Sequence, residues 1–168
     1  GQPVGNDPAP MPVLQTLCMD RVDRFPWAGD SRVIQTAVEY VFGEYELIRL
    51  ANERLMPVGL RPIPIITHVV PYTLDWSLAV IDYFRVSGDA DHMNKRIDDL
   101  LAVMETFDPL PNMMQGWYFF DWDKRIQSEE QTEAAYWGKY IQMCREAAWA
   151  ARQVGRTEAA EIFFAKAN

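Results

Sequence analysis

The stretch Ser128–Gly155, SEEQTEAAYWGKYIQMCREAAWAARQVG, sets the expected fold class of this chain. Its apolar residues recur at intervals of three or four, which is the spacing of one face of an α-helix. That face consists of Tyr136, Tyr140, Met143, Ala147, Ala150 and Val154. The helix is expected to begin near Ser128, with Glu129 to Gln131 in its first turn, and Gly155 is a typical helix-ending residue. We therefore predict one long amphipathic helix here.

Helical spacing recurs in five further parts of the chain, which gives about six helices in all. The expected starts are Asp30 or Ser31 as an N-cap, a point after Gly43, a point near Thr73, and Asp89 and Thr157 as N-caps. The proline-rich stretch 57–64 cannot lie inside a helix, because proline lacks the amide donor and clashes with the preceding turn. Since most links are short, we predict an all-α fold of antiparallel helical hairpins.

The faces of two later helices can also be assigned from the pattern. The expected buried residues are Met93, Ile97, Leu100, Leu101 and Met104 in the fourth helix, and Ala159, Ile162, Phe163 and Ala167 in the sixth.

The aromatic run 116–122 is compatible with a short strand, but no partner strand is evident elsewhere. Residues 1–17, with four prolines before residue 13, are expected to form an extended lead-in to one domain at 18–168.

Composition excludes several classes of partner. A net charge of -8 argues against nucleic acid, because a polyanion would be repelled. No apolar run approaches the roughly 20 residues of a membrane helix, and the first residues do not resemble a signal peptide.

We predict Cys18 and Cys144 to be free, buried thiols without metal-ligand spacing, His68 to lie in a loop, and His92 to lie on a helix surface. No metal or cofactor is expected.

The segment Asp20–Asp30, DRVDRFPWAGD, concentrates carboxylates, two arginines and a tryptophan just before a helix. Sugar-processing sites use these residue types: carboxylates transfer protons to glycosidic oxygens, charged groups hold hydroxyls, and an indole stacks on a sugar ring. The alternative interpretation is a charged loop with a helix cap and one core Trp. Asp30 in particular needs no role beyond that of an N-cap.

The region 18–168 resembles bacterial α-L-rhamnosidases and related six-hairpin glycosidases. The first motif of that family is matched by Cys18, Arg21, Asp23, Arg24, Trp27, Gly29 and Asp30, with Asp23 where the family usually has Glu. Weaker matches follow in the same order, at Tyr72–Trp76, Tyr83–Asp89, Phe119–Trp122 and Ala150–Gly155. Leu17 and Val22 depart from the family pattern, since relatives often carry Asp at both positions.

The resemblance implies a fold and a chemistry. The family fold is an (α/α)6 toroid of twelve helices, so this chain would be the first three hairpins, about half of it. Asp23 would be the general acid of an inverting hydrolysis. The residues implied to bind substrate are Asp20, Arg24, Trp27, Asp30, Trp76, Asp121 and Trp122. The family's general base lies in a later hairpin, so we expect this chain alone to be inactive, and its partners to be a carbohydrate and the remainder of a parent chain or a second copy.

Two other interpretations stay open. Loss of the Glu at Asp23 and of the Asp at Leu17 would favour a sugar-binding relative without catalytic activity. The small residues and glycine turn between Ala147 and Ala167 are also typical of a helical-repeat interaction scaffold, although no period of about 34 residues repeats. Core packing is an alternative role for Trp76, because it lies on a predicted helix. The sugar remains unassigned, and the compartment of the parent protein does as well, with a periplasmic or secreted location favoured.

Overall fold

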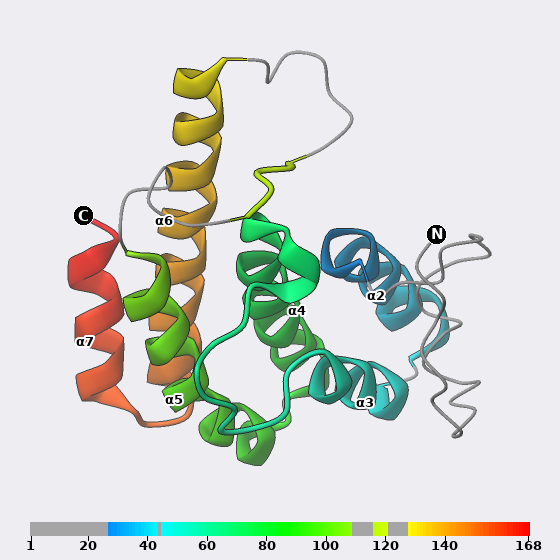
Figure 1. The fold of residues 1–168 in the computed structure, drawn as a ribbon. Coiled ribbons are helices and arrows are strands. Elements are labelled where there is room, and N and C mark those ends of the chain that lie inside the picture. Colours follow the sequence, from blue (N-terminus) through cyan, green and yellow to red (C-terminus); the bar gives the residue numbers. More distant parts are fainter. Residues whose placement is uncertain (1–26, 44, 109–115, 121–127) are drawn as a thin grey trace.

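A computed structural model describes residues 27–43, 45–108, 116–120 and 128–168. In these ranges the chain is mostly helical and contains no strand (Figure 1). The α-helices are α2 (Ala28–Phe42), α3 (Tyr45–Leu55), α4 (Val70–Ser87), α5 (Ala90–Phe107), α6 (Glu129–Gln153) and α7 (Thr157–Lys166), and a 3-10 turn, η2, spans Ile66–His68. The predicted all-α class is thus confirmed for the described residues.

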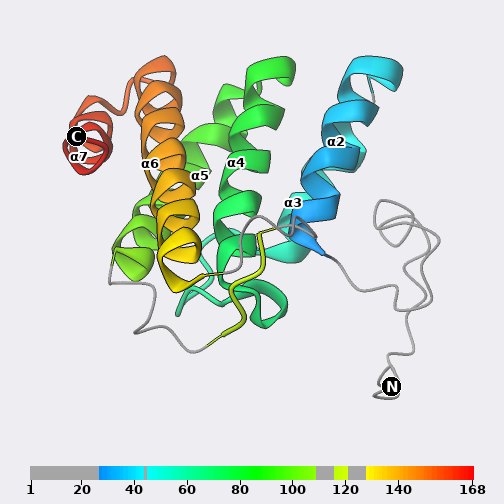
Figure 2. The same ribbon diagram turned by 90° about the horizontal axis from the view of Figure 1, so that it is seen from above.

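Helix α4 lies at the centre of the arrangement. It contacts α2, α3, α5 and α6, and fourteen of its eighteen residues are buried. Helices α2, α4 and α6 lie side by side in that order, and each contacts the helix that follows it in the chain (Figure 2). The core is formed around α4 by large side chains without solvent exposure, among them Trp76, Ile97, Tyr136 and Phe163. A site built on α4 therefore has a rigid support.

Most of the predicted helix ends are confirmed. Gly43 and Gly88 adopt φ values of 64° and 69°, a left-handed conformation that ends α2 and α4 and that glycine adopts without steric cost. Asp89 caps α5 by accepting a hydrogen bond from the His92 amide at 3.0 Å. Ser128 caps α6 in a capping box with Gln131. Helix α4 begins at Val70, earlier than predicted, because proline is tolerated in a first helical turn.

Two predicted N-caps are wrong. Helix α2 begins at Ala28 with Trp27 as N-cap residue, so Asp30 lies in the first turn, while Ser31 is buried and its hydroxyl accepts a hydrogen bond from the Gln35 side-chain Nε2. Helix α7 likewise includes Thr157 as its first residue. The acidic residue in the first turn of each of these two helices is still stabilising, because it interacts with the positive end of the helix dipole.

Other corrections concern burial. Ile162 is 42% exposed, and Ala160 takes its place on the buried face of α7. His92 is buried rather than on the surface, because α5 turns that side towards α3. Cys144 is a free, buried thiol as predicted, whereas Cys18 lies outside the described residues. None of the helices in the described ranges combines the length and apolar character needed to cross a membrane.

Candidate functional site

A cleft of about 470 Å³ opens beside the first turns of α2 and α4. Helix α2 contributes Asp30 and Arg32 to its polar lining, and α4 contributes Asp75. Lys139 reaches it from α6, and aromatic rings come from Tyr72 on α4 and from the segment 116–120. Side chains from three helices and one connecting segment therefore line the cleft.

The segment 116–120, which we call the strap, is fixed to the start of α4 by the backbone. The Val70 amide donates to the Trp117 carbonyl at 2.9 Å, and the Trp117 amide donates to the His68 carbonyl at 2.8 Å. These bonds form an isolated parallel bridge between Val69 and Trp117, so the aromatic run pairs with a neighbour that is not a strand. The strap thereby presents Phe119 and Phe120 to the cleft.

An ion pair forms the polar part of the cleft. Lys139 Nζ donates to both Asp75 carboxylate oxygens, at 2.6 Å and 2.7 Å, and the Asp75 side chain is only 7% exposed. Arg32 lies 3.9 Å from the same carboxylate and donates through Nε to Asp82 Oδ2 at 3.0 Å. Both cations are therefore balanced by protein carboxylates. The arrangement favours a neutral ligand with hydroxyl groups over a strongly charged one.

Aromatic side chains form the apolar part. Tyr72 lies edge-on to Trp27, with ring centroids 6.1 Å apart, and Lys139 Nζ lies 5.9 Å from the centroid of the Phe120 ring. A Cβ atom at Gly29 would lie 2.9 Å from the Tyr72 ring, so this close approach requires glycine. Rings beside hydrogen-bonding groups suit a ligand with one apolar and one polar face.

The residues predicted to form the site are distributed as follows. Asp30 lines the cleft, whereas Trp27 is not among the lining residues and only packs against one of them, Tyr72. Trp76 does not line the cleft: it is fully buried, and its indole donates to the Asn52 carbonyl at 2.9 Å. It follows Asp75 on α4, and one helical residue turns the side chain about 100° away. The predicted residues outside the described ranges are Asp20, Asp23, Arg24, Asp121 and Trp122.

Sequence reasoning missed Arg32, Asp75 and Lys139. Asp75 could have been identified from the sequence, because a carboxylate inside a strongly apolar helix needs a partner when it is buried. Its partner Lys139 is 64 residues away and carries no signal in a single sequence. Among the described residues, no group of three or more His, Cys, Asp or Glu side chains could hold a metal ion.

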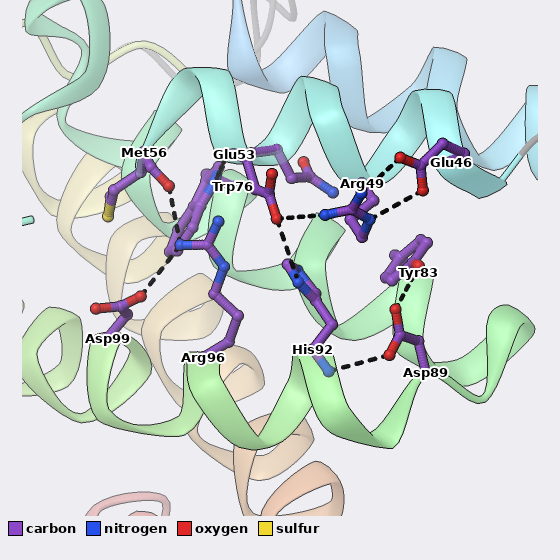
Figure 3. A network of polar contacts seen from close by, with 11 residues as sticks. Glu46, Arg49, Glu53, Met56, Trp76, Tyr83, Asp89, His92, Arg96 and Asp99 are labelled. Carbon is purple, nitrogen blue, oxygen red and sulfur yellow. Dashed lines mark hydrogen bonds and ion pairs between the residues drawn. The ribbon is translucent and has the colours of Figure 1, made fainter. Parts of the chain in front are cut away.

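A second polar network lies between α3 and α5 (Figure 3). The fully buried Arg96 donates to the Met56 carbonyl at 2.9 Å and to Asp99 Oδ2 at 3.1 Å. His92 Nδ1 lies 3.5 Å from Glu53, and burial together with the nearby Arg96 lowers the pKa of its imidazole. A buried arginine paired in this way fixes the position of α3 against α5 and is remote from the cleft lining. We interpret this network as structural.

No family model, curated protein sequence or solved structure matches this chain.

Proposed function

We propose that this chain is the first half of a six-hairpin glycoside hydrolase of the α-L-rhamnosidase type, and that its cleft binds a terminal sugar. The observation that carries the proposal is the convergence of Asp30, Asp75 and Lys139 with aromatic rings in one cleft. Carboxylates and an ammonium group are the partners that sugar hydroxyls need, and rings cover the apolar face of a sugar.

The order of the helices supports the same proposal. In a half-toroid the first helix of each hairpin would form an inner row, and α2, α4 and α6 do lie in one row (Figure 2). The cleft opens at the end of this row where α2 and α4 begin. The positive ends of both helix dipoles favour electronegative oxygen atoms at that place. A terminal sugar would therefore enter at this end of the row.

Catalysis would use groups beyond the cleft lining. In the proposal Asp23 protonates the leaving oxygen, and Asp20, Arg24, Asp121 and Trp122 complete the binding of the sugar. Inverting hydrolysis also needs a second carboxyl group, about 6.5–9.5 Å from the acid, to activate water. That group would belong to the remainder of a parent chain, so we expect this chain to bind a sugar without hydrolysing it.

The test is a titration of the isotopically labelled chain with L-rhamnose, followed by NMR. We expect the amide signals of Asp30, Asp75 and Lys139 to shift in a saturable way. Asp75→Asn weakens the acceptor of the Lys139 pair, so it should reduce affinity by about tenfold, the effect of one hydrogen bond to a charged group. The matched control is Asp91→Asn, because Asp91 is exposed in the first turn of α5 and remote from the cleft.

The same samples separate binding from catalysis. Incubation with an aryl α-L-rhamnoside should release no aryl alcohol above the buffer background. Saturable shifts confined to the cleft without turnover would support the proposal. Measurable turnover would contradict the assignment of the second carboxyl group to a later hairpin. Equal affinities in Asp75→Asn and Asp91→Asn, or no shift at all, would exclude sugar binding in this cleft.

A further inference from the structure

Trp117 of the strap is the most exposed of the tryptophans that the structure describes. Its side chain is 53% exposed, whereas the three aromatic residues that follow it, Tyr118, Phe119 and Phe120, pack against the core. A large aromatic side chain at the surface leaves apolar area in contact with water, which costs free energy. Exposure alone is ordinary for a single residue, so its meaning depends on how the indole is held and on what lies beside it.

The backbone holds the Trp117 indole in place. The Trp117 amide donates to the His68 carbonyl and the Trp117 carbonyl accepts from the Val70 amide, so both of its backbone polar groups are paired. The preceding Gly116 lies so close to α4 that an added Cβ atom would meet Val70 Cγ2 at 2.7 Å. The position of the indole is therefore set without burial of its side chain. A ligand that stacks on a ring held in this way loses less entropy than one that must first order it.

Successive side chains of the strap lie on opposite sides. Tyr118 packs edge-on against the buried Tyr136 of α6, with ring centroids 6.0 Å apart. Trp117 and Phe119, on either side of Tyr118 in the chain, contact each other, with ring centroids 4.7 Å apart and planes inclined by 36°. An extended segment places residues i and i+2 on the same face. Trp117 and Phe119 therefore form one aromatic platform on the side of the strap opposite to Tyr118.

The platform continues the cleft towards solvent. Phe119 lines the cleft, whereas Trp117 is not among the lining residues and contacts the cleft only through Phe119. A ligand that fills the cleft and extends along the strap would therefore place its next unit on Trp117. We propose that Trp117 and Phe119 form a second subsite, which binds the sugar ring linked to the terminal sugar in the cleft. This inference rests on the proposed sugar binding and adds that the ligand contains at least two sugar units.

The chemistry of the platform suits a neutral sugar ring. The apolar C–H face of a sugar can cover the indole, while the hydroxyl groups at the edge of the ring stay hydrated because Trp117 is open to water. The net charge of -8 disfavours a nucleotide or another polyanion at this place. One indole beside a half-buried phenyl ring also falls far short of the roughly 1,000 Å² that a specific protein interface buries.

Two ligands titrated against the labelled chain and followed by NMR test the inference. Methyl α-L-rhamnoside has one sugar ring, and the disaccharide rutinose carries D-glucose after its α-L-rhamnose unit. We expect rutinose to bind the wild-type chain about fivefold to tenfold more tightly, the effect of one stacking contact. Trp117→Ala should remove this gain and leave the affinity for methyl α-L-rhamnoside unchanged, whereas Trp117→Phe should retain part of it. The matched control is Phe164→Ala, because Phe164 is a half-exposed ring on α7 that does not line the cleft.

The outcomes separate the second subsite from the cleft. A gain for rutinose that is lost in Trp117→Ala but kept in Phe164→Ala would support the inference. Equal affinities of the wild-type chain for both ligands, or an undiminished gain in Trp117→Ala, would overturn it and leave sugar binding in the cleft intact. Binding of rutinose alone, dependent on Trp117, would support the second subsite and contradict the proposed function of the cleft. Binding of neither ligand would overturn both.

Discussion

Burial changes the protonation of Glu39. Its side chain is only 5% exposed, and its Oε1 atom has no hydrogen-bond partner in the described part of the chain. Burial, reinforced by repulsion from Asp82, raises the pKa of the Glu39 carboxyl from 4.5 to about 7. Near neutral pH this group is therefore partly protonated in the folded state, whereas it is ionised in the unfolded chain.

The raised pKa of Glu39 makes the free energy of unfolding depend on pH. The folded state binds the Glu39 proton more tightly than the unfolded chain does. The stability that protonated Glu39 contributes is therefore fully present below pH 4.5 and is lost as the pH rises through 7. We predict that Glu39→Gln removes this loss, which amounts to at most about 3 kcal/mol for such a shift. Urea unfolding at pH 5 and pH 8 measures it, with the exposed Glu105→Gln as control. An equal pH dependence in Glu39→Gln and wild type would contradict the prediction.

At the scale of elements, the strap depends on one close backbone approach. A Cβ atom at Gly116 would lie 2.7 Å from Val70 Cγ2 and 3.2 Å from the His68 carbonyl oxygen. The strap and the start of α4 share backbone hydrogen bonds at this point, so neither can move freely. By contrast, a Cβ atom at Gly138, in the middle of α6, would meet nothing within 4 Å.

The two glycines form a matched pair for substitution by alanine. Gly116→Ala should destabilise the protein by about 1–3 kcal/mol, because an added methyl group overfills a packed site. Gly138→Ala should stabilise it by about 0.5–1 kcal/mol, because alanine favours the helix interior. Thermal and urea unfolding of both variants measures these changes. A Gly116→Ala variant that is as stable as the wild type would show that the strap does not pack against α4 as described, whatever the effect of Gly138→Ala.

Helical periodicity correctly predicts the helices whose apolar residues face the core. It predicted α5 from Met93, Ile97 and Leu100, which are all fully buried. In α2 the residues Val33, Ile34, Ala37 and Val41 also recur at helical spacing, but the buried side of this helix is the polar one, with Ser31, Gln35 and Glu39. Periodicity reports that a helix has two faces, and tertiary packing determines which of them is covered.

The candidate site was predictable only in part. Asp30 was found because it follows an unusual cluster of charged residues and a tryptophan, and it does line the cleft. Asp75 and Lys139 were not found, because their pairing depends on how α4 and α6 lie against each other. Local sequence patterns identify residue types that suit a site. The partners that complete it come from distant helices and require the fold.

At the scale of the whole molecule, stability is concentrated around α4. This helix contacts α2, α3, α5 and α6, and its Trp76, Leu74 and Ile81 side chains have no exposed surface. Helix α7 contacts α6 and α5, and α2 contacts only α4 and α3 among the helix pairs with extensive packing. Because opening α4 would break four interfaces at once, its amides can exchange only when most of the fold opens.

We therefore predict a gradient of hydrogen exchange across the molecule. Amides in α4 should exchange slowest, at the rate of global unfolding, and those in α2 and α7 should exchange faster through local opening. Exchange measured by mass spectrometry on peptides from each helix tests this order. If peptides from α4 exchanged as fast as those from α7, the fold would lack the central support that positions the cleft.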